Sequence, residues 1–248
     1  TLHLMLTASF VVIPLLLRDG LGLATSSHWH LYLPVFLLAI ATMVPFVILA
    51  EKKRQMKPVF VGFVGLVTLA LLGFLYFGDR FWGVFLLLYL FFTGFNLLEA
   101  TLPSMVSKIA PPDLKGTAMG VYSTSQFLGA FAGGVGAGYL SGRYGQDAVF
   151  VFAATAGFIW FWIAFFMKAP RHLSSRLENI EGLSPEARAG LASALLEVSG
   201  VEEAVVVGRD GVAYLKVDRS RLDEESLANC LRQYRENFAF DSTGSRAG

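Results

Sequence analysis

Long apolar runs alternate with short polar connectors over the first part of the chain. A helix needs about 20 mostly apolar residues to cross a membrane core about 30 Å thick, and six segments meet this requirement. In chain order these segments are 2–18, 31–50, 58–77, 81–105, 116–140 and 147–167. The pattern predicts an all-α membrane bundle of six transmembrane helices over residues 1–170.

The pattern changes after Pro170, where charged residues recur. Apolar residues there follow the spacing of short amphipathic helices and strands, as in a small soluble domain. A Ser-Pro-Glu start at Ser184 predicts a helix that ends before Gly200. Two β-branched runs flank a Gly-Arg-Asp-Gly turn and predict a hairpin. The expected order is β-α-β-β-α-β, a ferredoxin-like α+β domain over 171–241, followed by a disordered tail over 242–248. The two strands of the hairpin are 201–207 and 212–217, and the second helix is 222–235. The flanking strands are 173–180 and 237–240.

The composition supports a membrane-embedded chain and gives no indication of an enzyme. Hydrophobic residues make up 54% and aromatic residues 14% of the 248 residues, a balance typical of membrane proteins. The formal net charge of +1 provides no basic excess for nucleic acid. The single cysteine, Cys230, excludes an internal disulfide and falls on the apolar stripe of its helix. No nucleophile–base pair, phosphate loop or metal-ligand spacing occurs, so we expect no catalytic residue, metal or cofactor.

The positive charges predict the topology. Alternate connectors lie on opposite sides of the membrane, and most Lys and Arg residues fall on one of these sides, which is therefore expected to be cytoplasmic. The C-terminal domain lies on the same side. The residues on the basic side are Lys52, Lys53, Arg54, Lys57, Lys108, Lys115, Lys168 and Arg171, against Arg18, Arg80 and Arg143 on the other.

Polar residues within the spans mark candidate functional positions. Asn96 and Glu99 belong to one helical stripe, and such a stripe cannot face lipid cheaply. It faces either a cavity used for substrate or proton coupling, or a neighbouring helix through a hydrogen bond that fixes packing. His3 on the first helix and Gln126 on the fifth belong to similar stripes.

Two further features each have two interpretations. The small-xxx-small glycines of the fifth helix, Gly129, Gly133, Gly134 and Gly138, permit close helix packing, either inside one bundle or as a sliding seam against another. The basic loop with Lys52, Lys53, Arg54 and Lys57 is either an orientation signal or a cytoplasmic gate closed by salt bridges.

One stretch carries a specific resemblance. The string FNLLEATLPSMVSKIAPPDLKGTAMGVYSTSQFLGAFAGG, residues 95–134, closely resembles helices ten and eleven of major facilitator superfamily transporters. The similarity is to the proton-coupled, YajR-type efflux branch, whose members end in a cytoplasmic ferredoxin-like YAM domain. The loop 51–57 is similar to the family's basic loop, without its full D-x-x-x-R-x-G-R-R pattern.

The resemblance implies the C-terminal half of a twelve-helix transporter in the bacterial inner membrane, with a cytoplasmic regulatory domain. Its partners are then lipid, an N-terminal six-helix half, protons and a small-molecule substrate exported by alternating access. His3, Asn96, Glu99 and Gln126 are assigned to the cavity or the inter-half interface. The alternative is a membrane-anchored sensor whose tail binds a ligand or partner, although an anchor requires neither the polar stripe nor the glycines.

Overall fold

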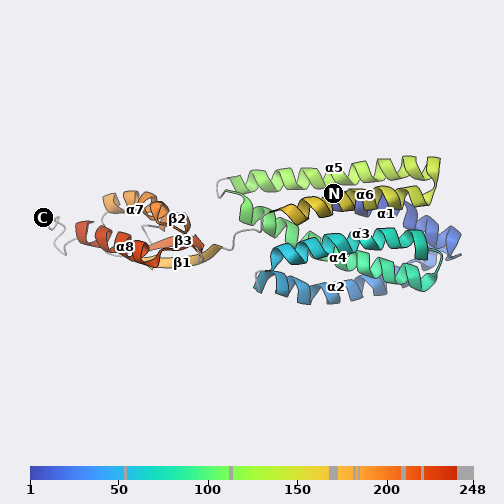
Figure 1. Cartoon of the computed structure of the whole chain (residues 1–248), viewed down its shortest axis with the longest axis horizontal. Helices are drawn as coiled ribbons and strands as arrows, with labels where there is room; N and C mark the ends of the chain where they lie inside the picture. The colour runs from blue at the N-terminus through green and yellow to red at the C-terminus, as the bar shows by residue number, and fades with distance from the viewer. Residues whose placement is uncertain are drawn as a thin grey trace. The chain divides into compact units, whose positions relative to one another are not determined.

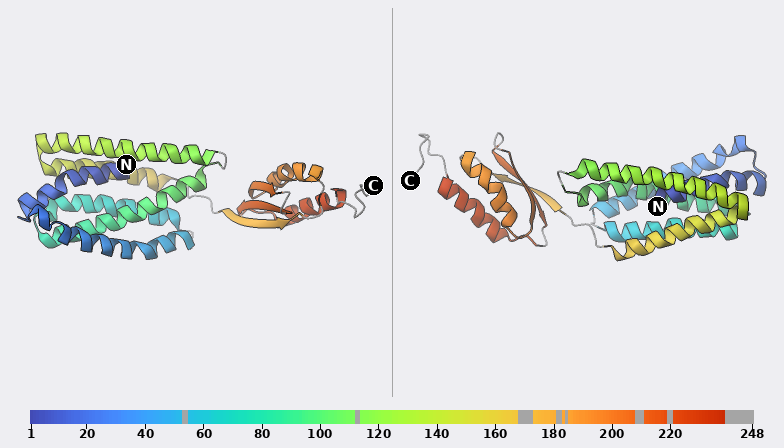
Figure 2. Two further views of the ribbon diagram at one scale, coloured as in Figure 1. Left: turned by 180° about the vertical axis from the view of Figure 1, so that it is seen from behind. Right: turned by 90° about the horizontal axis from the view of Figure 1, so that it is seen from above.

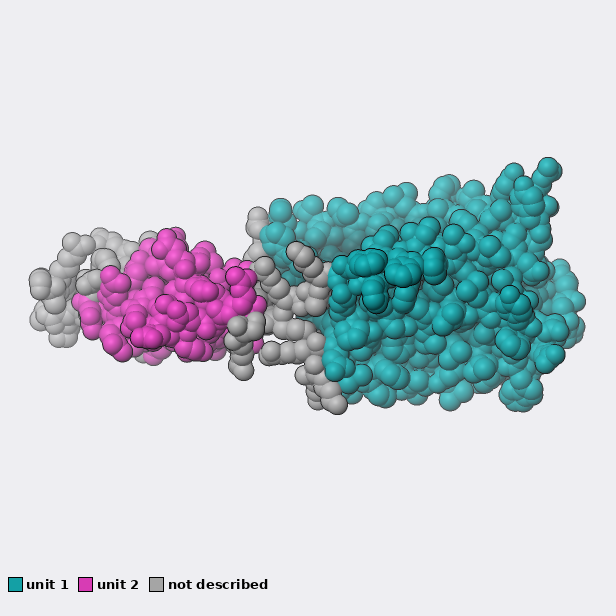
Figure 3. Space-filling view, in the orientation of Figure 1, with its two compact units in different colours: residues 1–170 teal, residues 171–248 magenta. Residues whose placement is uncertain are grey.

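A computed structural model describes residues 1–52, 55–111, 114–167, 173–180, 183, 185–207, 211–218 and 221–238. The chain forms two compact units, Thr1–Pro170 and Arg171–Gly248 (Figure 3). Each unit has its own hydrophobic core.

The first unit is a helical bundle (Figure 1). Its elements are α1 (Leu2–Leu15), the π-helix η1 (Leu16–Gly20), the short 3-10 helix η2 (Thr25–Ser27), α2 (Trp29–Lys52), α3 (Met56–Phe77), α4 (Phe81–Ile109), α5 (Lys115–Tyr144) and α6 (Gln146–Phe166). The π-helix follows directly after the turn that contains Pro14, where the missing N–H and the proline ring disturb the regular ladder.

Several helices are longer than the sequence predicted. The connector expected over 141–146 is reduced to Gly145, whose φ of 86° lets the chain reverse between α5 and α6. Among the described residues, five helical segments are long and apolar enough to cross a membrane. The exception is α5, which has 30 residues but many of them glycine, serine and threonine.

The helices interleave across the unit. α1 packs mainly on α5 and α6, whereas α4 packs on α2 and α3, and α3 contacts α6 where the two groups meet (Figures 1 and 2). At that junction the Phe74 and Phe150 rings stack with centroids 4.8 Å apart, and Phe60 meets Trp160 edge to face. The core therefore runs through the middle of the bundle, and the first three helices do not form a separate cluster.

The second unit is a small α+β domain made of β1 (Leu173–Asn179), α7 (Pro185–Glu197), β2 (Val201–Val207), β3 (Val212–Asp218) and α8 (Glu224–Phe238). Its antiparallel sheet has the order β1-β3-β2. Ala213, Leu215 and Val217 are buried and Tyr214 is exposed, as the alternation predicted. Both helices pack on the buried face.

The fourth strand expected at 237–240 is wrong for its first half. Asn237 and Phe238 are the last residues of α8, and positions 239 and 240 lie outside the described residues. α8 continues because its polar and charged side chains include good helix formers and no glycine or proline interrupts it before Phe238. The described sheet matches the first three strands of the β-α-β-β-α-β order.

Candidate functional site

Glu99 lies where α4, α1 and α5 come together. Its neighbours Leu97 and Leu98 are fully buried in the bundle, so the opposite stripe of α4 carries the polar side chains. Contacts from both other helices reach the Glu99 carboxylate. The packing therefore provides a carboxylate with partners from two neighbouring helices.

Gln126 of α5 holds one oxygen of this carboxylate. Its Nε2 donates to Glu99 Oε1 at 3.0 Å and to the Tyr122 hydroxyl at 2.9 Å. An amide nitrogen has two N–H donors, and both are used here. The result is a chain of three side chains that runs from α4 to α5.

His3 of α1 faces the other carboxylate oxygen. Its Nδ1 lies 3.8 Å from Glu99 Oε2, which is beyond ordinary hydrogen-bond distance. Oε2 is buried and has no hydrogen-bond partner among the described residues. The His3 ring also meets Phe95 edge to face, with centroids 5.9 Å apart. One oxygen of Glu99 is thus held by a hydrogen bond, and the other has none among the described residues.

A cavity of about 150 Å³ adjoins this cluster. It is large enough for a few water molecules, each of which occupies about 30 Å³ in the liquid. The side chains of His3 and Glu99 keep 24% and 37% of their exposure, whereas the Oε2 atom of Glu99 is itself buried. The cavity is lined by Thr1, Leu2, His3, Leu102, Tyr122, Ser125, Gln126 and Trp160.

Asn96 lies one turn from Glu99 but does not join its hydrogen bonds. Its Nδ2 is buried without a partner among the described residues, and the same holds for the Tyr32 hydroxyl on α2. Phe10 stacks on Tyr32 and meets Phe92 edge to face. This aromatic cluster therefore carries one unpaired polar atom, the Tyr32 hydroxyl, which is suited to binding a polar group of a ligand.

The four predicted seam glycines divide into two pairs. Gly129 and Gly133 face α1, and a Cβ added at Gly133 would collide with Leu4 and Thr7. The Thr7 Oγ1 lies 2.9 Å from the Ala130 carbonyl and 2.8 Å from the His3 carbonyl, so its single hydrogen is shared between α5 and its own helix. Gly134 and Gly138 have no atom of this unit within 4 Å of an added Cβ. The first pair packs inside the bundle, and the second pair is open.

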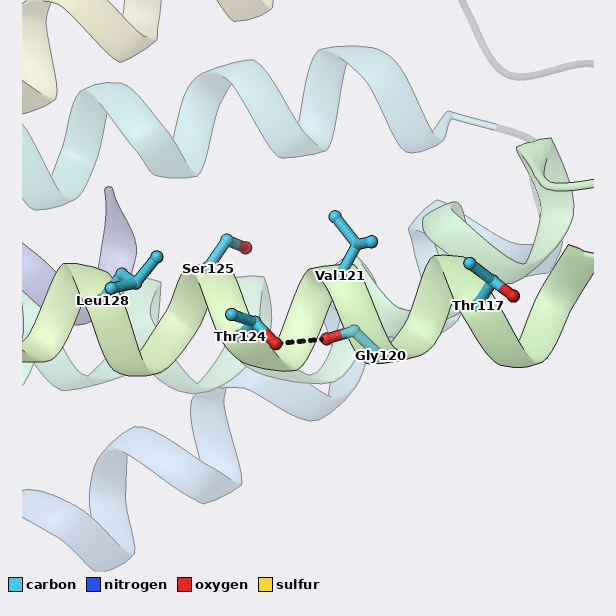
Figure 4. A pocket seen from close by; sticks show the side chains of 6 residues that line it. All are labelled: Thr117, Gly120, Val121, Thr124, Ser125 and Leu128. Carbon is cyan, nitrogen blue, oxygen red and sulfur yellow. Dashed lines mark hydrogen bonds between the residues drawn. The ribbon is translucent and has the colours of Figure 1, made fainter.

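The open side of α5 forms a shallow groove of about 500 Å³ (Figure 4). It is lined by Thr117, Gly120, Val121, Thr124, Ser125 and Leu128. Thr124 Oγ1 donates to the Gly120 carbonyl at 2.9 Å, so this hydroxyl is satisfied within its own helix. Val121 is 65% and Phe127 76% exposed on the same helix. The groove is lined mainly by small or aliphatic side chains, as helix-packing surfaces in membranes are.

The basic loop is described only in part. Lys57 lies in the first turn of α3 and is half-buried, and Lys52 ends α2. Lys53 and Arg54, and the side chain of Lys52, lie outside the described residues. The gating prediction for this loop stays a prediction.

Sequence reasoning missed two side chains of the cluster. Tyr122 precedes Gln126 by one turn on the same stripe, a spacing visible in the sequence, but its role as an acceptor depends on the side-chain conformation. Trp160 of α6 lines the cavity, but its apolar segment contains no polar stripe that could have predicted this position.

Comparisons with known proteins identify the family of this chain. The model of the Major Facilitator Superfamily matches residues 1–219. The chain is 40% identical over 233 residues to the inner membrane transport protein YajR of Escherichia coli strain K12, covering 94% of this chain and 51% of that protein.

Uncharacterized transporters of Buchnera aphidicola are also similar. The one from subspecies Baizongia pistaciae is 27% identical over 161 residues, which cover 64% of this chain and 41% of the relative. The one from subspecies Acyrthosiphon pisum is 29% identical over 132 residues, covering 53% and 34%. The chain spans about half the length of YajR and less of the other two. Together with the helical bundle, these matches show that the chain belongs to the major facilitator superfamily of membrane transporters and is of the YajR type.

Proposed function

We propose that the chain forms the C-terminal half of a proton-coupled efflux transporter for small molecules, embedded in the bacterial inner membrane. The observation that carries this proposal is the Glu99 carboxylate in a membrane-length helix, with one oxygen unpaired beside a cavity. An ionisable side chain inside a membrane span is costly and is typical of ion and substrate pathways. Glu99 would take up a proton when the pathway opens to one side and release it on the other.

The open face of α5 supports an arrangement of two halves. Gly134, Gly138 and the groove around Gly120 leave space for a closely packed helix from an N-terminal six-helix half. Rocking of one half against the other would then expose the cavity alternately to the two sides. The α+β unit would lie in the cytoplasm and regulate this motion.

The proposal is tested with Glu99→Gln in the full-length protein, in inside-out membrane vesicles with an imposed pH gradient. A panel of small molecules is first screened on the wild type for compounds that discharge the gradient. We expect the variant to lower proton-coupled discharge by about tenfold or more, as removal of a proton-transfer group does. Glu225→Gln is the matched control, because it makes the same change on the exposed surface of the second unit. An unchanged discharge rate for Glu99→Gln would exclude Glu99 as the proton carrier and favour the membrane-anchored sensor.

A further inference from the structure

The Gln126 side chain is the polar link between two helices that otherwise pack only lightly. α4 and α5 contact one another far less than α1 and α5 do. The amide of Gln126 reaches from α5 to Glu99 on α4, and its other N–H goes to Tyr122 on its own helix. The Gln126 amide therefore connects Glu99 directly to α5.

The observed hydrogen bonds are compatible with an ionised carboxylate. Glu99 Oε1 accepts one N–H of Gln126, and the Tyr122 oxygen accepts the other. The hydrogen of the Tyr122 hydroxyl is then free to donate into the adjoining cavity, which Tyr122 lines. Every donor of the amide is used, and the carboxylate only accepts.

A protonated Glu99 supports a second pattern in the same three side chains. If Glu99 carries its proton on Oε1, this hydroxyl needs an oxygen as acceptor. A half-turn of the Gln126 amide places its carbonyl oxygen there. The same amide oxygen has a second lone pair, which accepts the Tyr122 hydroxyl hydrogen. We infer that Gln126 is a positioning residue whose amide turns when Glu99 changes its protonation state. As a consequence, the Tyr122 hydroxyl donates into the cavity only while Glu99 is ionised.

Few other titratable groups face this carboxylate. From α1 comes His3, whose Nδ1 lies 3.8 Å from Oε2. From α5 comes Tyr122, and α6 contributes Trp160, which does not titrate. His3 bears on Oε2, whereas Gln126 bears on Oε1. The two carboxylate oxygens of Glu99 therefore contact different helices, Oε2 facing α1 and Oε1 facing α5.

This inference rests on the proposed function for the role of Glu99 as proton carrier, and it adds a coupling step. A substrate that accepts the Tyr122 hydrogen would bind when Glu99 is ionised and would lose this donor when Glu99 is protonated. Proton and substrate would then exclude one another without competing for the same atom.

The test follows the Gln126 amide directly in this chain, reconstituted in lipid nanodiscs. The sequence has four glutamines, so side-chain nitrogen labelling gives few amide signals, and Gln126→Asn assigns the one of interest. Protonation of Glu99 is followed in parallel by the infrared carbonyl stretch that Glu99→Gln removes. We expect the amide signal to move with the same pH midpoint as the carboxyl band, over about two pH units, and to be insensitive to pH in Glu99→Gln.

The outcomes separate this inference from the proposed function. If the carboxyl band titrates while the Gln126 amide stays unchanged, the amide does not read Glu99, and the inference is wrong while proton uptake stands. If no carboxyl band titrates while the protein stays folded, Glu99 does not exchange a proton, and both proposals fail.

Variants in the full-length protein add a transport readout. Gln126→Met keeps the length of the side chain but removes both donors, so the pH midpoint of export should move upward by about one unit. Gln146→Met is the matched control, because it makes the same change at the first residue of α6, outside the cavity lining. A midpoint for Gln126→Met equal to that of Gln146→Met would overturn the positioning role.

Discussion

Single residues of this chain combine buried contacts with free polar atoms. Glu99 is held at Oε1 and free at Oε2, and Asn96 keeps a buried, unpaired Nδ2 among the described residues. Buried polar atoms without a partner are rare in folded proteins, and each one requires an explanation. Under the proposed function, binding of a proton or a substrate group would provide this explanation.

In the second unit, Asp223 is a residue whose charge contributes to stability. The Ser226 N–H donates to Oδ1 at 3.0 Å and the Ser226 hydroxyl donates to Oδ2 at 2.7 Å. These hydrogen bonds hold the pKa of the Asp223 carboxyl below its usual value. The ionised cap therefore stabilises the unit above the unfolded-state pKa, and this contribution is lost as the pH falls through the folded-state pKa.

We predict that Asp223→Asn flattens this pH dependence, because asparagine caps a helix equally well without titrating. The wild type should lose stability relative to the variant as the pH falls below about 4. Cys230 provides the readout, since it is the only cysteine in the chain and is half-buried against the core of the unit. Its labelling by an aryl disulfide, which reacts in acid, gives the urea midpoint at each pH. Parallel profiles for the two proteins would contradict the prediction.

The polar residues of the site could be predicted individually but not as a cluster. Helical spacing indicated that Asn96, Glu99 and Gln126 avoid lipid, because that conclusion needs only the periodicity of one helix. The hydrogen bond from Gln126 to Glu99 joins positions 27 residues apart. Its formation depends on the rotation of α4 and α5 about their axes, which packing against α1 determines.

Among the helices, α5 shows how one element presents two different faces. Gly133 meets α1 directly, while Gly134, the next residue, faces open space in this unit. Adjacent residues on a helix point about 100° apart, so they belong to different surfaces.

We predict opposite effects of alanine at these two glycines. Gly133→Ala should destabilise the bundle by about 1–3 kcal/mol, because the added methyl overpacks the contact with Leu4 and Thr7. Gly134→Ala should be neutral or slightly stabilising in this chain, since alanine favours the helix and no atom opposes it. Thermal unfolding in detergent, followed by tryptophan fluorescence, measures the difference. Equal melting temperatures for the two variants would show that α1 does not lie against Gly133.

Element ends were predicted well for the three strands of the described sheet and less well for the membrane helices. β2 covers 201–207 as expected, because β-branched runs bounded by glycine mark a strand clearly. The predicted end of the fifth helix near 140 was wrong, and α5 continues to Tyr144. Glycine ends helices in water but is common inside membrane helices, so Gly138 and Gly142 are poor end signals there.

At the scale of the whole molecule, the two units can be observed independently. All four tryptophans lie in the first unit, and the single cysteine lies in the second. Tryptophan fluorescence therefore reports the bundle, and labelling of Cys230 reports the α+β unit.

We predict that Leu191→Ala destabilises only the second unit. Leu191 of α7 is fully buried in its core, and truncation of such a side chain costs about 2–5 kcal/mol. The urea midpoint for Cys230 labelling should fall, while the tryptophan signal of the bundle should be unchanged. Leu196→Ala, on the same helix but 49% exposed, is the matched control. A parallel fall in the tryptophan midpoint would show that the two units unfold together.

Removal of the second unit should leave the first in the membrane. Deletion from Leu173 onward removes no apolar segment of membrane length among the described residues. We expect the truncated chain to resist alkaline extraction from membranes as the full chain does. Extraction of the truncated chain alone would show that the second unit is needed for insertion.

The interleaving of the helices has a consequence for the time course of synthesis. The hydrogen bond from Thr7 to Ala130 joins residues 123 positions apart. At about 5–20 residues per second, the ribosome needs roughly 6–25 s to make the partner after Thr7 has emerged. During this interval α1 lacks the surface on which it finally packs. A membrane chaperone or insertase that shields α1 during these seconds would therefore cover a helix surface that α5 has not yet buried.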